Sequence, residues 1–182
     1  MNSCEMILAG FGGQGILFAG KMLAYAAMLR NRHLSWLPSY GPEMRGGTAN
    51  CHVIISDDPV GSPIILKPDI MVAMNRPSLD KFEDEVVPGG MIFVDSSLID
   101  RRVKRTDVEA VYINATETAD KAGRKTLANM VMLGAVIEKT GLFSTDEMKE
   151  TIIKSIPAKK AALAAPNIEA VEMGAEYIRK NK

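Results

Sequence analysis

A run of glycines near the start of the chain has the spacing of a phosphate-binding turn. Gly10, Gly12 and Gly15 match the pattern G-x-G-x-x-G, with the apolar run 6–8 before them and the apolar, helix-forming run 16–29 after them. Glycine tolerates a positive φ and lets a helix pack closely on a strand. The free N–H groups at the start of that helix can hold an anion. The candidate residues for cofactor binding or for a subunit interface are Gly10, Gly12, Gly13, Gln14 and Gly15.

The residues after this turn argue against a dinucleotide site. A dinucleotide fold places an acidic residue at the end of the second strand, about 20 residues on, to hold the ribose. Here the second strand is expected at 33–37, it ends in Pro38, and the next carboxylate is Glu43, inside a later loop. A single motif match is also a weak signal. We therefore favour a turn that packs strand on helix, or faces a protein partner, over a turn that binds a nucleotide.

A second glycine-rich stretch, residues 38–47, is too rich in Pro, Gly and Ser to form a regular element. Loops of this length between elements often carry function. Glu43 and Arg45 could pair with each other, cap an element or reach outward, and composition leaves an internal ion pair and an outside contact equally open. The second set of candidate residues is Tyr40, Gly41, Pro42, Glu43, Arg45, Gly46 and Gly47.

Other polar residues are weaker candidates. His52 lies in an alternating stretch and His33 at a strand start. The alternation puts the neighbouring Cys51 on the opposite face from His52, so the local sequence places no Ser, Cys or carboxylate against the imidazole. Both histidines are therefore interpreted as structural. Asp95, followed by two serines, lies just past a buried strand, where open α/β sheets bind ligands, but a helix cap or turn is the favoured interpretation. We assign no catalytic residue and no metal ligand.

The composition excludes several classes of function. Lys and Arg total 22, and so do Asp and Glu, so the chain lacks the basic character of a nucleic-acid binder and any general attraction to an anionic membrane. Cys4 and Cys51 form no C-x-x-C pair, which argues against a zinc or cluster motif and suits a reducing cytoplasm. The apolar amino terminus lacks a basic region and is broken by glycines and Lys21. We expect neither a signal peptide nor a membrane span.

Strand and helix patterns alternate along the chain, which indicates one α/β domain over residues 1–182. The runs 70–74 and 91–94 are apolar throughout, as is typical of strands buried on both faces of a parallel sheet. We expect a doubly wound three-layer α/β/α sandwich, Rossmann-like and mostly parallel, with these two strands and 5–9 near its centre. The strand 48–55 is the one expected to run antiparallel. The remaining expected strands are 33–37, 108–113 and an irregular or edge strand at 60–66.

Helical patterns account for most of the remaining chain. Residues 129–140 are apolar nearly all round, so this helix must be buried, either inside the domain or against another chain. Ser144 and Glu147 form a capping box for the next helix. Pro166 is expected to split the last helical stretch in two. Because of the 129–140 helix and the abundance of Met, we expect the isolated chain to self-associate as a homodimer.

Taken together, these motifs resemble the gamma subunit of the 2-oxoacid:ferredoxin oxidoreductases, which include pyruvate, 2-oxoglutarate and ketoisovalerate enzymes. The turn alone is a weak match, but the second loop is specific in order and spacing, and the resemblance covers essentially the whole chain. It is carried by Gly-Phe-Gly-Gly-Gln-Gly at 10–15, Ser-Tyr-Gly-Pro-Glu-Met-Arg-Gly-Gly at 39–47, Lys-Pro-Asp at 67–69 and Asn-Arg-Pro at 75–77.

The resemblance implies one subunit of an enzyme that oxidatively decarboxylates a 2-oxoacid with coenzyme A, giving an acyl-CoA, CO2 and reduced ferredoxin. Thiamine diphosphate and iron–sulfur clusters carry that chemistry in the family. This sequence has no Gly-Asp-Gly thiamine motif and no cysteine cluster, so we expect no cofactor on this chain. The implied partners are alpha and beta subunits, and in some enzymes a ferredoxin-like delta subunit. Both glycine loops are expected on one edge of the sheet, near the catalytic subunits.

The resemblance also bears on the substrate and on Arg45. Pyruvate-type gamma chains tend to have Arg-Gly-Ala-Pro where this chain has Arg-Gly-Gly-Thr at 45–48. That difference indicates a 2-oxoglutarate or branched-chain enzyme, and of the two we expect 2-oxoglutarate. Arg45 could contact substrate or coenzyme A across the subunit boundary, or could pair with Glu43 and shape the loop. The alternative function is an independent nucleotide-dependent oxidoreductase.

Overall fold

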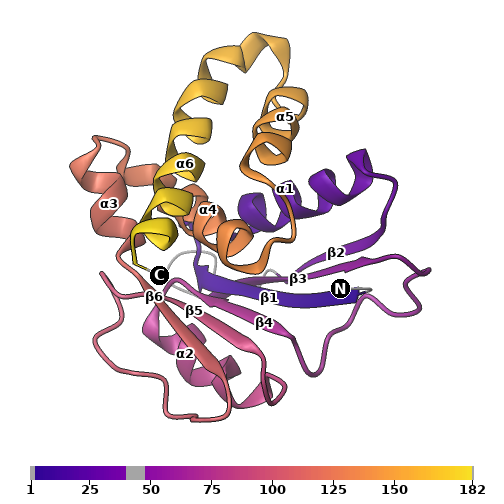
Figure 1. The fold of residues 1–182 in the computed structure, drawn as a ribbon, viewed down its shortest axis with the longest axis vertical. Helices are drawn as coiled ribbons and strands as arrows, with labels where there is room; N and C mark the ends of the chain where they lie inside the picture. Colours follow the sequence, from indigo (N-terminus) through magenta and orange to yellow (C-terminus); the bar gives the residue numbers. More distant parts are fainter. Residues whose placement is uncertain (1–2, 40–47, 182) are drawn as a thin grey trace.

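A six-stranded mixed sheet is the centre of the computed structural model, which describes residues 3–39 and 48–181 (Figure 1). The strands follow the order β2-β3-β1-β4-β5-β6 across the sheet. Their bounds are β1 (Ser3–Phe11), β2 (His33–Ser39), β3 (Thr48–Ser56), β4 (Ile70–Ala73), β5 (Met91–Asp95) and β6 (Glu109–Ile113).

Parallel pairing runs from β1 through β4 and β5 to β6, whereas β3 runs antiparallel to both of its neighbours, β1 and β2. The mostly parallel sheet and the antiparallel strand predicted at 48–55 are therefore confirmed. β1 and β4 are the central pair, and β4 is buried along its whole length. Such complete burial is the physical reason for its uninterrupted apolar sequence.

Helices lie on both sides of the sheet, which confirms the doubly wound three-layer prediction. Figure 1 shows α1, α4, α5 and α6 above the sheet and α2 below it. The helices are α1 (Ile16–Leu29), α2 (Arg76–Phe82), α3 (Ala115–Lys121), α4 (Ala128–Thr140), α5 (Thr145–Ser155) and α6 (Ala164–Lys180). Short 3-10 turns span Glu83–Glu85, Lys125–Leu127 and Ala158–Leu163.

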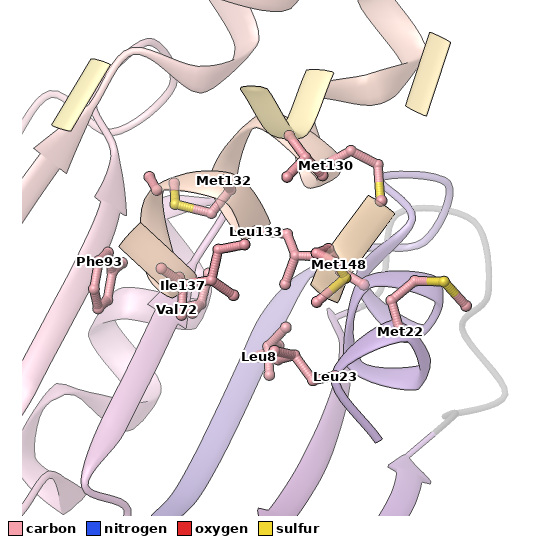
Figure 2. Packing of buried hydrophobic residues seen from close by; sticks show 14 of the residues in the cluster. Leu8, Met22, Leu23, Val72, Phe93, Met130, Met132, Leu133, Ile137 and Met148 are labelled. Carbon is pink, nitrogen blue, oxygen red and sulfur yellow. The ribbon is translucent and has the colours of Figure 1, made fainter. Parts of the chain in front are cut away.

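The helix predicted at 129–140 is α4, and its surroundings lie within this chain. Leu133 and Ile137 point from α4 toward Val72 and Phe93 of the sheet, as Figure 2 shows. Met130, about two turns before Ile137 on α4, lies within the same buried cluster. Flexible Met side chains suit the irregular gaps of such a cluster. Because α4 is covered inside the chain, it no longer supports the expectation of self-association.

Two glycines let α4 and α6 cross at close range. A Cβ built on Gly134 would lie 2.0 Å from the main-chain oxygen of Val171, and one built on Gly174 would lie 1.8 Å from that of Val131. No side chain fits at either position, so the two helices contact each other backbone to backbone. This crossing places α6 over the outer side of α4.

Two sequence predictions were wrong in detail. Residues 60–66 form no strand: Ile65 alone is buried, while Ile64 and Leu66 are exposed and Gly61 and Pro63 prevent regular pairing. Pro166 does not split the last helix, because α6 begins at Ala164 and the proline lies in its first turn. The N–H groups in the first turn of a helix have no carbonyl partner within the helix. A proline, which lacks an N–H, is therefore tolerated there.

Candidate functional site

The glycine turn joins β1 to α1 and is held by the side chain of Gln14. The Gln14 amide oxygen accepts a hydrogen bond of 2.6 Å from the Phe11 N–H, and its amide nitrogen donates one of 2.9 Å to the Met74 carbonyl. The Gln14 N–H also donates to the Phe11 carbonyl at 3.2 Å. Gly10 makes room for this arrangement, because a Cβ there would lie 2.7 Å from the Gln14 amide oxygen.

Positive φ values occur at the third and last glycines of the turn. Gly13 has φ of 93° and Gly15 has φ of 74°, a region that side chains other than glycine's rarely adopt. Gly15 also needs its small size, because a Cβ would lie 2.5 Å from the side-chain nitrogen of Asn129. That nitrogen donates to the Gly15 carbonyl at 3.0 Å, so α4 fixes the start of α1.

Within residues 3–39 and 48–181, the strand order leaves no place at this turn for the ribose-binding carboxylate of a dinucleotide fold. That carboxylate belongs at the end of a parallel second strand beside β1. In this sheet β1 lies between β4 and β3, and β3 occupies the place where that second strand would be. β3 runs antiparallel to β1, and its first residue, Thr48, pairs with Phe11. Gln14 bridges the ends of β1 and β4. Open α/β sheets bind ligands between two neighbouring strands whose following helices lie on opposite faces of the sheet, and β1 and β4 are such a pair. The side chain of Gln14, a residue of the turn itself, therefore holds the turn in place.

The surface beside the turn is uncharged. A hollow of about 210 Å³ is lined by Phe11, Gly12, Gly13, Gly15, Ile16, Leu17, Phe18 and Ala49, none of which carries a charge. Two aromatic rings flank it and stay partly exposed, Phe11 at 37% and Phe18 at 38%. Exposed aromatic rings around a rigid turn are typical of a protein contact surface.

Neither ring is among the candidates predicted from the sequence, although the sequence carries a signal for each. Phe18 lies on the α1 stripe that also carries the exposed residues Lys21 and Met28. An aromatic side chain on the same helical stripe as a lysine is such a signal. Phe11 lies at the very end of β1, within the glycine motif itself.

The second candidate loop falls almost entirely outside the described residues. This applies to Tyr40, Gly41, Pro42, Glu43, Arg45, Gly46 and Gly47. The strands on either side of it are described: Ser39 ends β2 opposite Asn50, and Thr48 begins β3 opposite Phe11. Residues 39 and 48 therefore lie at the same end of the strands as the glycine turn.

The weaker candidates have structural roles. Asp95 is fully buried and accepts hydrogen bonds from the Thr116 hydroxyl at 2.5 Å and from the Ser97 N–H at 3.1 Å, so it fixes the start of α3. The Nδ1 atom of His52 accepts from the Ile65 N–H at 3.0 Å, and burial lowers the pKa of His52 below its ordinary value. Both interpretations from the sequence agree with this geometry.

The buried thiols are not placed for chemistry. Burial raises the pKa of Cys4 and that of Cys51 to about 12 each, which keeps both protonated at neutral pH. Across residues 3–39 and 48–181, no three His, Cys, Asp or Glu side chains come together to hold a metal ion. Within the same ranges, no helix has the length and apolar character needed to cross a membrane.

Comparison with known proteins gives the family. The family model described as pyruvate ferredoxin/flavodoxin oxidoreductase matches residues 5–177. The chain belongs to this family. A 2-oxoglutarate synthase subunit KorC from Methanocaldococcus jannaschii is 39% identical over 156 residues, which are 84% of this chain and 83% of that protein.

Other relatives place the family domain in longer chains and solved structures. A ketoisovalerate oxidoreductase subunit VorA from Methanothermobacter thermautotrophicus is 46% identical over 96% of this chain, and this chain spans only 36% of its length. The gamma subunit of a keto/oxoacid ferredoxin oxidoreductase from Geobacter sulfurreducens PCA has a TM-score of 0.85 and 30% identity, covering 99% of this chain and 98% of that one. The predicted resemblance and the fold are thereby confirmed.

Proposed function

We propose that this member of the pyruvate ferredoxin/flavodoxin oxidoreductase family is the gamma subunit of a 2-oxoacid:ferredoxin oxidoreductase without a redox centre of its own. The observation that carries the proposal is the family match over residues 5–177, with relatives of similar length that are themselves named as subunits. The complex oxidatively decarboxylates a 2-oxoacid to an acyl-CoA and reduces ferredoxin. Thiamine diphosphate, iron–sulfur clusters and coenzyme A belong to the complex and are held by other chains.

The glycine turn and its uncharged rim supply the contact with those chains. Gln14 holds the turn rigid, so the Phe11 and Phe18 rings are presented without a large ordering cost on binding. The segment 40–47 joins strands that end at this same edge. In this proposal the two loops meet the alpha and beta subunits together, and a delta subunit where one exists. Within this proposal, two roles of Arg45 stay open: it touches coenzyme A at this contact, or it pairs with Glu43.

The proposed substrate is 2-oxoglutarate or a branched-chain 2-oxoacid. The Arg-Gly-Gly-Thr ending of the second loop supports both, and of the two we expect 2-oxoglutarate. Relatives named for 2-oxoglutarate and for ketoisovalerate are 39% and 46% identical, respectively. The proposed setting is a reducing cytoplasm, since both cysteines are free thiols.

Co-expression with candidate alpha and beta subunits tests the proposal. We expect the chain to co-purify with them, and the assembled complex to reduce ferredoxin or a viologen dye with one 2-oxoacid and coenzyme A. Comparing 2-oxoglutarate, ketoisovalerate and pyruvate then identifies the substrate. Titration of the chain alone with NAD, NADP and FAD addresses the nucleotide alternative. Micromolar binding of any of these, with turnover by the chain alone, would overturn the subunit proposal.

A further inference from the structure

The carboxyl ends of the parallel strands form one continuous surface that begins at the glycine turn. The Gln14 amide joins the end of β1 to the Met74 carbonyl at the end of β4. A guanidinium nitrogen of Arg76, the first residue of α2, lies 3.4 Å from the Asp100 carboxylate in the segment after β5. The N–H of Ser96, directly after β5, donates at 2.9 Å to the carbonyl of the last residue of β6. Printed side by side, these contacts connect the glycine turn to β6 without a break.

A hollow of about 290 Å³ lies at the β6 end of this surface. Its lining is Ser96, Ile99, Asp100, Arg101, Arg102 and Tyr112. Ile99 is buried, whereas the preceding residue, Leu98, is 48% exposed. Asp100 is the carboxylate of the lining, and it already faces Arg76. Tyrosine and arginine are the residue types that carry much of the binding energy at protein interfaces, so this hollow has the composition of a contact site.

The Arg102 side chain is held in place by an aromatic ring. Its guanidinium carbon lies 4.3 Å from the centroid of the Tyr112 ring. The Tyr112 hydroxyl in turn accepts a hydrogen bond of 2.9 Å from the Val103 N–H, which fixes the ring. The ring covers one face of the guanidinium plane, and the N–H groups lie along the edges of that plane. Because Arg102 is exposed, those N–H groups can reach a group outside the chain.

The neighbouring cations already have carboxylate partners. Arg101 lies 2.7 Å from Asp80 and 2.6 Å from Glu83. Arg105 pairs at 2.6 Å with the carboxylate two residues further along the chain. Arg102, in contrast, has no carboxylate partner among residues 3–39 and 48–181. A fixed and unpaired guanidinium is suited to a planar anion that accepts two parallel hydrogen bonds, such as the carboxylate of Asp or Glu.

We propose that this hollow receives an acidic side chain, aspartate or glutamate, from an alpha or beta subunit. The proposal rests on the subunit role and extends its contact surface from the glycine turn to the end of β6. The Arg102 fork binds both carboxylate oxygens, and Tyr112 shields the pair from water. A protein partner also covers the exposed Leu98 beside the hollow, which a small free anion would leave in water.

A binding titration of the full chain with purified alpha and beta subunits tests the charge and the geometry of Arg102 separately. Arg102→Ala removes the fork, so we expect the dissociation constant to rise about 10-fold or more. Arg102→Lys keeps the charge without the planar fork, so we expect it to recover only part of that loss. The affinity of the parent should fall more steeply with added salt than that of Arg102→Ala, because only the parent makes the ion pair.

Lys67→Glu is the control for net charge and is compared with Arg102→Glu. Lys67 is exposed just before the amino end of β4, away from the carboxyl ends of the strands. The two reversals change the net charge equally, but only Arg102→Glu places like charges in the contact. We therefore expect Arg102→Glu to weaken binding about 100-fold and Lys67→Glu to bind like the parent. Circular dichroism checks that every variant is folded.

Three results would overturn the proposal while the subunit role stands. The first is equal binding of Arg102→Ala and the parent, and the second is an equal loss in the two reversed variants. The third is an Arg102→Ala complex that assembles normally but has a raised KM for coenzyme A or the 2-oxoacid, since the anion is then a small molecule. A parent chain that binds neither subunit would overturn the subunit role itself.

Discussion

Gln14 donates a hydrogen bond of 2.9 Å to the main-chain carbonyl of Met74, and thereby ties the β1–α1 turn to the end of β4. The same amide accepts from Phe11 at 2.6 Å. A glycine pattern that commonly leaves its N–H groups open to a phosphate is here combined with a side chain that links the ends of β1 and β4. The Gln14 bridge distinguishes this turn from that of a dinucleotide-binding enzyme more clearly than the glycine pattern does.

Replacing Gln14 should loosen the turn. Gln14→Ala removes two hydrogen bonds, so we expect the free energy of unfolding to fall by about 1–2 kcal/mol in urea denaturation. Gln14→Glu keeps the acceptor for Phe11 but places a carboxylate against the Met74 carbonyl. We expect it to be the less stable of the two at neutral pH and to recover when acid protonates the carboxylate. Equal stability of Gln14→Ala and the parent would show that the bridge contributes nothing.

The α4–α6 crossing predicts an asymmetric effect of two glycine substitutions. Gly134→Ala places a methyl group 2.0 Å from the Val171 carbonyl, so the helices must separate. We expect a loss of about 2 kcal/mol or more, or no folded protein. Gly61→Ala is the matched control: nothing lies within 4 Å of its Cβ, so the stability should stay within about 0.5 kcal/mol. Thermal unfolding by circular dichroism compares the three proteins.

Local patterns in the sequence were sufficient for most of the elements. The continuous apolar runs marked β4 and β5, the strict alternation marked β3, and Ser144 with Glu147 formed the predicted capping box. These features depend on residues close together in the chain. The prediction of a strand at 60–66 was wrong because its apolar residues suggest a strand, although only Ile65 is buried in the core.

Contacts between distant residues could not be predicted in the same way. The sequence showed that α4 is apolar all round, but its cover is α6, and the close approach depends on Gly134 and Gly174, which are 40 positions apart. The role of Gln14 depends on Met74 in another strand. The glycine spacing located the turn, whereas its contact with Asn129 of α4 depends on a residue more than 100 positions away.

His52 should make stability depend on pH. Burial lowers its pKa below the ordinary value of 6.5, so protonation favours the unfolded chain. Its contribution is fully present above pH 6.5 and is lost as the pH falls from there through the lowered pKa. His52→Asn keeps an acceptor near the Ile65 N–H but cannot titrate, so its stability should change less over this range. An NMR titration that places the His52 pKa at or above 6.5 would contradict the account.

The two cysteines should be inert in the folded protein. Because burial raises each thiol pKa to about 12, almost no thiolate exists at pH 8. We expect a disulfide reagent such as Ellman's to modify neither residue in native protein and both after denaturation. Rapid modification of one thiol under native conditions would show that β1 or β3 opens locally.

Binding of this chain to the proposed alpha and beta subunits is the decisive test of the contact surface at the glycine turn. Phe18→Ala removes an exposed ring beside the glycine turn, while Met28→Ala truncates a 48% exposed side chain on the same stripe of α1, about 15 Å away along the helix. Alanine favours helix at both sites, so neither change should unfold α1. With purified alpha and beta subunits in a binding titration, we expect Phe18→Ala to weaken assembly about 10- to 100-fold and Met28→Ala to leave it unchanged. Unchanged binding of Phe18→Ala would contradict the assignment of this edge as the subunit contact.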